Sequence, residues 1–146
     1  MIGDSVLDLI GSTPMVRINK LNTNKDIKVY AKLEGFNPTG SIKDRVALKM
    51  IEEAEKSGEL KPGKVIIEAT SGNTGIGLAM VGSQKGYKVV IVMSSSVSIE
   101  RRKMIRAFGA EVILTSPDLG TDGAIMKVQE MISEQPDKYY NPNQFS

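Results

Sequence analysis

Strand-like and helix-like stretches alternate along most of this chain, and the alternation limits the folds that it can adopt. Three short apolar runs have the length and β-branched content of buried strands, and each precedes a stretch of helical length. The pairs are 65–68 with 74–85, 88–93 with 99–108, and 111–114 with 124–134. Strand–helix–strand units connect parallel strands by right-handed crossovers. We therefore predict an α/β fold, a three-layer domain whose parallel sheet is covered on both faces.

Shorter elements are expected before these units. A helix near Val6–Ile10 precedes two strands, Met15–Ile18 and Ile27–Leu33, and a turn follows at Gly35–Gly40. A helix is then predicted over 42–56. Ser41 could cap it, Ser57-Gly58 ends it, and its apolar face comprises Val46, Met50, Ile51 and Ala54.

Composition excludes several classes of protein. With 146 residues the chain fits one domain, and its 19 basic and 17 acidic residues are intermixed, so nucleic acid is not an expected partner. The densest basic run, Arg101-Arg102-Lys103, is interpreted as a solvated helix face. Cysteine and histidine are absent, which excludes disulfides, Cys/His metal sites and Ser–His or Cys–His catalytic pairs. No basic leader or run of about 20 apolar residues is present, so we expect a cytoplasmic protein without a membrane contact.

A lysine stands at the start of the helix predicted over 42–56. Lys43 belongs to Asn37–Arg45, which reads Asn-Pro-Thr-Gly-Ser-Ile-Lys-Asp-Arg. The helix dipole, together with desolvation by an apolar neighbour such as Ile42, favours a neutral, nucleophilic amine that can form a Schiff base with a carbonyl cofactor. By position alone, however, Lys43 is better interpreted as one of the many solvated lysines of this chain.

A second turn, Thr70–Gly75, follows a predicted strand and opens a predicted helix. Free backbone N–H groups and the helix dipole make such a turn a possible anion site. On these grounds alone it could hold a phosphate, a carboxylate or nothing, because Ser, Gly and Asn also serve simply to cap and turn. Two phosphate motifs fail. The glycines 72, 75 and 77 reverse the dinucleotide-binding order, and after Gly35 and Gly40 a serine occupies the position where a P-loop needs lysine.

Four stretches of the chain resemble the cysteine synthase (O-acetylserine sulfhydrylase) family, among the tryptophan-synthase-β-like, fold type II pyridoxal phosphate enzymes. The resemblance runs along the whole chain but covers about the first half of a typical member. Ser94-Ser95-Ser96 departs from the Pro-Glu usual in the family, which affects a loop more than the chemistry. The four stretches are Asn37–Arg45, Glu68–Gly75, Ser98–Lys103 and Gln144–Ser146.

The resemblance implies specific roles for residues in these stretches. Lys43 would be the catalytic lysine, bound to pyridoxal 5'-phosphate as a Schiff base and then acting as the base that removes the substrate α-proton. Asn73 would contact the phenolic oxygen of the cofactor. Asp44 and Arg45 are interpreted as structural. The substrate carboxylate would be bound by Thr70, Ser71, Gly72, Thr74 and Gln144.

The activity that the resemblance implies is a β-replacement, in which O-acetylserine and sulfide give L-cysteine and acetate. A cystathionine β-synthase-like condensation of serine with homocysteine is the alternative within the class, and a catalytically incompetent binding domain is the alternative outside it. We expect residues 1–146 to form the N-terminal domain of a two-domain enzyme, with 1–35 packed against the other domain. Family members are usually homodimers. This chain alone is expected to show no appreciable synthase activity, because the family's phosphate loop has no counterpart here.

Overall fold

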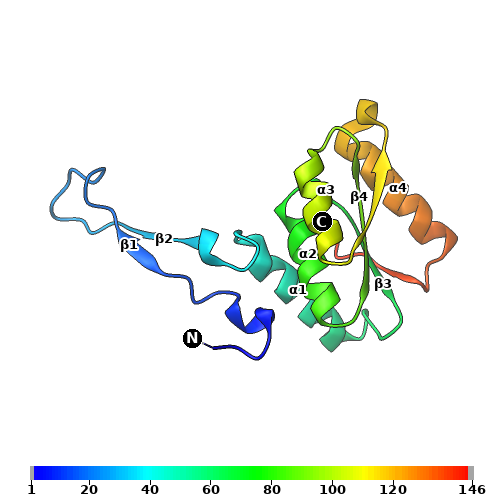
Figure 1. The fold of residues 1–146 in the computed structure, drawn as a ribbon, viewed down its shortest axis with the longest axis horizontal. Helices are drawn as coiled ribbons and strands as arrows, with labels where there is room; N and C mark the ends of the chain where they lie inside the picture. Colours follow the sequence, from blue (N-terminus) through cyan, green and yellow to red (C-terminus); the bar gives the residue numbers. More distant parts are fainter. Residues whose placement is uncertain (1, 145–146) are drawn as a thin grey trace.

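The structure is a computed structural model that describes residues 2–144, and it consists of a layered body and an extended arm (Figure 1). The body contains a four-stranded parallel sheet in the order β5-β4-β3-β6. Its strands are β3 (Val65–Ala69), β4 (Lys88–Ser94), β5 (Glu111–Thr115) and β6 (Tyr139–Tyr140). The predicted parallel sheet is therefore confirmed.

Helices cover both faces of this sheet, as Figure 1 shows. Helices α1 (Lys43–Ser57), α2 (Asn73–Gln84) and α3 (Ile99–Ala107) lie on one face, and α4 (Gly120–Glu134) lies on the other. The chain moves outward from β3 to β5 and then returns across the sheet to β6. Because right-handed crossovers in opposite directions pass over opposite faces, this reversal places α4 alone on its side.

Each face of the sheet has its own apolar core. Alternate residues of a strand point to opposite faces, so Ile66 packs with Ile51 and Leu78 under α1 and α2, whereas Ile67 packs with Val128 under α4. The strands are buried on both faces, which explains why their sequences are apolar runs and not alternating patterns. The three-layer arrangement predicted from the sequence is thus confirmed.

Helices α1 and α2 pack side by side and run in the same direction. Near their starts, a Cβ atom on Gly77 would lie 3.1 Å from the carbonyl oxygen of Lys43. Near their ends, Lys85 Nζ is 2.7 Å from Glu55 Oε2. The N-termini of the two helices are therefore neighbours, at the edge of the sheet where the parallel strands have their carboxyl ends.

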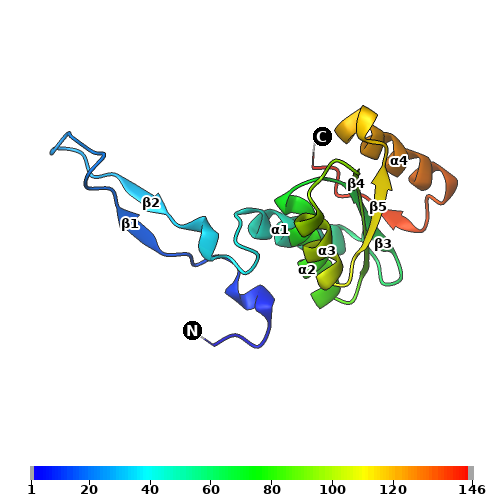
Figure 2. The ribbon, with the colours of Figure 1, turned by 45° about the horizontal axis from the view of Figure 1, so that its top comes forward.

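The arm is a two-stranded antiparallel hairpin that projects away from the body (Figure 2). It pairs β1 (Met15–Arg17) with β2 (Tyr30–Lys32) after a short 3₁₀-helix, η1 (Val6–Leu9), and a second one, η2 (Glu34–Phe36), leads back to the body. Large apolar side chains of the arm are exposed, among them Met15, Val16, Leu21, Ile27 and Tyr30.

Several predicted boundaries are wrong in detail. Strand β2 is shorter than 27–33, α4 begins at Gly120 after a 3₁₀ turn, η3 (Pro117–Leu119), and β6 was not predicted. The buried face of α1 contains Ala47, Ile51 and Ala54, whereas Val46 and Met50 are only partly buried. Ala47 is buried because α2 approaches it closely at Gly77. In residues 2–144 no helix is long and apolar enough to cross a membrane.

Candidate functional site

The loop before Lys43 is held by the first turn of α1. Asp44 is fully buried, and its carboxylate accepts hydrogen bonds from the backbone N–H of Thr39, at 2.7 Å, and from the Thr39 hydroxyl. Ser41 Oγ accepts from the backbone N–H of Lys43 at 3.1 Å, so Ser41 does serve the helix start, although Ile42 occupies the N-cap position. These bonds fix the backbone at Lys43.

Arg45 ties the same turn to the base of the arm. Its Nε donates to Glu34 Oε2 at 2.7 Å, and Thr13 Oγ1 donates to Glu34 Oε1 at 2.6 Å. The hydrogen bond from Arg45 lowers the pKa of Glu34 to about 2, so this carboxylate stays charged at neutral pH. The structural interpretation of Asp44 and Arg45 is thereby confirmed.

The Lys43 side chain is exposed, and within residues 2–144 its amine has no hydrogen-bond or ion-pair partner. The expected desolvation by Ile42 is wrong for this chain, because Ile42 is 53% exposed. Lys43 is therefore placed by a rigid backbone but is not covered by it. An amine in this position can reach a ligand that approaches the carboxyl edge of the sheet.

The Thr70–Thr74 turn lies beside it, between the end of β3 and the start of α2. Thr70 and Thr74 are buried, Ser71 and Gly72 are partly buried, and Asn73 is exposed. The N-cap residue of α2 is Gly72, no side chain caps this helix, and the space that a Gly72 side chain would fill is open. An uncapped helix N-terminus with free space in front of it suits an anionic group.

A small hollow of about 90 Å³ borders this turn. Thr70 and Ser71 line it together with Ser94, Ser96 and Thr121. Hydroxyl groups from the ends of two strands and from α4 therefore gather at the carboxyl edge of the sheet, where ligands of open α/β folds bind.

Arg101 and Arg102 also support this edge. Arg101 and Lys103 are exposed, as expected of a solvated helix face, whereas Arg102 is partly buried. Arg101 Nη1 donates to the carbonyl oxygen of Ser71 at 3.1 Å. Arg102 Nε donates to the carbonyl oxygen of Val97 at 3.0 Å and so fixes the loop after β4. The sequence shows that both arginines lie on the helix that follows the next strand after the Thr70–Thr74 turn. It does not show that Arg101 contacts Ser71, because this contact depends on the tertiary fold.

Gln144 is brought to this edge by β6, which lies next to β3. Tyr139 and Tyr140 pair with Val65 and Ile66, and the chain then continues toward the carboxyl end of β3. The backbone N–H of Asn143 donates a hydrogen bond to Glu68 Oε2 at 2.8 Å, directly before Gln144. Of the stretch Gln144–Ser146, residues 145 and 146 lie outside the described residues.

Glu68 itself was not among the predicted site residues. It is 2% exposed, and burial raises the pKa of its carboxyl to about 7 even though backbone hydrogen bonds act in the opposite direction. The available signal was one acidic residue within the otherwise apolar strand Val65–Ala69. In the described part of the chain no cluster of acidic side chains could hold a metal ion.

Comparison with known proteins gives a consistent result. Residues 6–146 match the family model described as "Pyridoxal-phosphate dependent enzyme". A cysteine synthase of Aquifex aeolicus is 50% identical over an alignment of 146 positions, which covers 98% of this chain and 45% of that protein. The chain thus spans less than half the length of this curated relative.

Solved structures resemble the whole chain in the same way. The crystal structure of O-acetyl serine sulfhydrylase isoform 3 from Entamoeba histolytica superposes with a TM-score of 0.95 at 47% identity, covering 100% of this chain and 45% of that one. An O-acetylserine dependent cystathionine beta-synthase from Helicobacter pylori has a TM-score of 0.90 at 38% identity, covering 100% of this chain and 48% of its own.

Proposed function

Because the chain belongs to the family of pyridoxal-phosphate dependent enzymes, we propose that it carries the lysine-bearing half of a site that converts O-acetylserine and sulfide to L-cysteine and acetate. One observation supports this most directly: the exposed amine of Lys43 and the uncapped N-terminus of α2 stand on adjacent helix starts. An amine that can bind an aldehyde is thereby placed next to a turn that can bind a carboxylate.

The residues present fit pyridoxal phosphate at its aldehyde end. The Lys43 amine is free to bind the aldehyde carbon covalently, and the exposed Asn73 amide at the start of α2 would hydrogen-bond the phenolic oxygen. When bound, the cofactor supplies an electron sink for the substrate Cα. We assign no described residue to its phosphate.

The turn and Gln144 would hold the amino-acid substrate by its carboxylate. Backbone N–H groups at Gly72 and Thr74 and the hydroxyls of Thr70 and Ser71 offer donors, and Gln144 would approach from β6. With the carboxylate fixed, Lys43 Nζ would take the α-proton and later return it. Acetate leaves the β-carbon, and sulfide forms the new C–S bond.

Covalent trapping tests this proposal. The chain is incubated with pyridoxal phosphate and reduced with borohydride, and the labelled peptide is mapped. We expect the label on Lys43 and its loss in Lys43→Arg. Lys49→Arg serves as the matched control, since Lys49 lies on the same helix and pairs with Glu53 at 2.7 Å. Labelling of Lys49, or equal labelling of many lysines, would contradict the assignment and favour a binding domain without synthase chemistry.

The Helicobacter pylori neighbour favours one alternative, a condensation that forms cystathionine. Product analysis with sulfide and with homocysteine as competing nucleophiles distinguishes the two, and we expect cysteine to predominate. This measurement requires a complete enzyme, in which further protein surface covers the site around Lys43. Since Lys43 and Ile42 are exposed here, we expect no appreciable synthase activity from the 146-residue chain alone.

The covering surface would come from a second domain and a second subunit. We propose that residues 1–146 act as the N-terminal domain of a two-domain homodimeric enzyme, in which the arm packs against the other domain. The exposed apolar side chains of the arm support this arrangement.

A further inference from the structure

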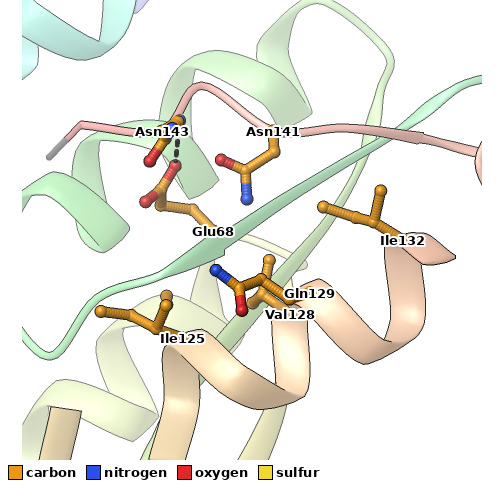
Figure 3. A pocket seen from close by; sticks show the side chains of 8 residues that line it. Glu68, Ile125, Val128, Gln129, Ile132, Asn141 and Asn143 are labelled. Atoms are coloured by element: carbon orange, nitrogen blue, oxygen red, sulfur yellow. Dashed lines mark hydrogen bonds between the residues drawn. The ribbon is translucent and has the colours of Figure 1, made fainter. Parts of the chain in front are cut away.

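Strand β3 and the segment 141–144 are joined in an unusual way. The backbone ladder between β3 and β6 extends only over Val65–Tyr139 and Ile66–Tyr140. Beyond it the segment still follows β3, and the backbone N–H of Asn143 is bound by a side chain of that strand. Glu68 Oε2 accepts from the N–H of Asn143 at 2.8 Å, as the dashed line in Figure 3 shows. Beyond the last paired residues of β3 and β6, the Glu68 carboxylate therefore provides the hydrogen bond between the two segments.

The cost of burying this carboxylate indicates a specific use for it. Within residues 2–144 no lysine or arginine forms an ion pair with Glu68, and its carboxylate is instead hydrogen-bonded by the backbone N–H of Asn143. Burying a carboxylate without a cation is unfavourable unless hydrogen bonds stabilise its charge. Here the hydrogen bond ties Glu68 to Asn143, which lies 75 positions later in the sequence and directly precedes Gln144.

The backbone of Asn143 adds a second observation. Its φ is +49°, in the left-handed region that few residues other than glycine, asparagine and aspartate adopt readily. The chain therefore turns at Asn143 directly before Gln144. A turn of this kind, tied down by Glu68, gives Gln144 a defined position at the carboxyl end of β3.

We propose that Glu68 is a positioning residue that holds Asn143 and Gln144 against the end of β3 and thereby sets where the Gln144 amide meets the carboxylate of an amino-acid ligand. The inference rests on the proposed function for the role of Gln144. Glu68 itself touches no ligand in this account. Its carboxylate acts, through Oε2, on the backbone of the segment that carries the ligand-binding side chain.

The surroundings of Glu68 allow the test to use pH. Tyr140 is a titratable group on which the charge of Glu68 acts. Burial, followed by the charges of Glu59 and Glu68, raises the pKa of Tyr140 above its ordinary value of 10. Asn141 and Gln129, which together with Glu68 line the 310 Å³ pocket in Figure 3, are neutral amides. A titration between pH 5.5 and 8.5 therefore changes Glu68 while Tyr140 stays protonated.

The first experiment follows backbone amides of the isotopically labelled 146-residue chain by NMR. We expect the Asn143 and Gln144 amide signals to shift together with a midpoint near pH 7. The shift should vanish in Glu68→Gln and persist in Glu111→Gln, which removes an exposed carboxylate from another strand of the same sheet. Signals that do not titrate, or that titrate equally in Glu68→Gln, would overturn the inference.

The second experiment separates positioning from simple stabilisation. The chain carrying pyridoxal phosphate is titrated with L-serine at pH 8, and binding is followed by the Thr70–Thr74 amide signals. We expect Glu68→Gln and Gln144→Ala each to weaken binding about three- to tenfold, with the double variant no weaker than Gln144→Ala. Additive losses would overturn the positioning role, because Glu68 would then act independently of Gln144.

The two experiments also distinguish failure of this inference from failure of the proposed function. If Lys43 is not labelled and L-serine shifts no signal in any variant, the proposed function fails, and the ligand role of Gln144 with it. If Lys43 is labelled and L-serine binds, but the Asn143 and Gln144 amides are indifferent to Glu68, only the positioning role fails.

Discussion

At the scale of single residues, two charged side chains of this edge have opposite surroundings. Lys43 is exposed and unpaired among the described residues, whereas Glu68 is buried and bound by the backbone N–H of Asn143. Lys43 is therefore suited to contact a ligand, and Glu68 is suited to fix the segment 141–144 against β3. Their behaviour on titration and mutation should therefore differ.

Glu68 should make the stability of the fold depend on pH. Its pKa is about 7 in the folded chain against 4.5 as its ordinary value, so the folded state binds the extra proton between these values. The resulting stabilisation is fully present below pH 4.5 and is lost as pH rises through 7. The change is on the order of 3 kcal/mol. We expect the melting temperature to fall between pH 5 and 8, and the Glu68 contribution to this fall to be absent in Glu68→Gln.

The control for that measurement is Glu111→Gln, whose melting curve should change with pH as the unmodified chain does. A fall in melting temperature that is identical in Glu68→Gln would show that other groups cause it. Glu34 does not interfere, because its lowered pKa contributes stability above about pH 4.5 that is lost only on acidification toward pH 2.

Ser71 belongs to the same scale, and its hydroxyl should matter for the substrate but not for the cofactor. Removing one hydrogen bond to a charged carboxylate costs about 1.5–3 kcal/mol, which weakens amino-acid binding about ten- to hundredfold. We expect this loss in Ser71→Ala with pyridoxal phosphate labelling of Lys43 unchanged. Ser133→Ala, at an exposed position on α4, is the control. Loss of labelling with normal substrate affinity would assign the turn to the cofactor instead.

Which residues could be foreseen depends on the distance over which their partners lie. Lys43 and the Thr70–Thr74 turn were predictable because a motif and a helix start are local in sequence. Glu68 and Arg101 were not, since their partners lie 75 and 30 residues away and depend on the strand order. Exposure of Ile42 was also unpredictable, because an apolar residue before a helix gives no sign of what covers it.

At the scale of elements, the contact between α1 and α2 determines where Lys43 stands. A Cβ on Gly77 would lie 3.1 Å from both the Lys43 carbonyl oxygen and Ala47 Cβ, closer than ordinary contacts. Gly77→Ala should therefore push the two helix starts apart. The higher helix propensity of alanine offsets part of the cost, so we expect a net destabilisation of about 1 kcal/mol.

Labelling of Lys43 reports on the position of this lysine more directly than the stability of Gly77→Ala does. We expect borohydride trapping on Lys43 to decrease in Gly77→Ala, whereas Gly35→Ala, where a Cβ meets nothing within 4 Å, should leave trapping unchanged. Normal trapping in a destabilised Gly77→Ala would mean that the spacing of α1 and α2 does not matter for the lysine.

The elements themselves followed from the sequence where periodicity was strong. Strands β3, β4 and β5 agree with their predicted ranges to within one residue at each end, because buried parallel strands are apolar throughout. Strand β6 has only two paired residues, too few for a pattern, and it forms because β3 offers a free edge. The start of α4 was missed since glycines and aspartates at 118–123 resemble a loop.

At the scale of the whole molecule, the arm and the body differ in how they meet solvent. The body buries its apolar residues in two cores, whereas the hairpin between Gly11 and Asn37 presents apolar side chains to water. A two-stranded hairpin gains little stability by itself. Its base is fixed by the Glu34–Arg45 ion pair, so the arm is anchored where it leaves the body and uncovered beyond that point.

This exposure should make the 146-residue chain self-associate through the arm. Leu21 is 88% exposed and Ile27 is 53% exposed, and apolar surface of this kind is normally covered by a partner. We expect sedimentation velocity to show concentration-dependent association that decreases in Leu21→Lys/Ile27→Lys. Met126→Lys, which adds a charge to an exposed apolar position on α4, should not reduce it. Association that depends on Met126 and not on the arm would place the apolar contact on the α4 face and contradict self-association through the arm.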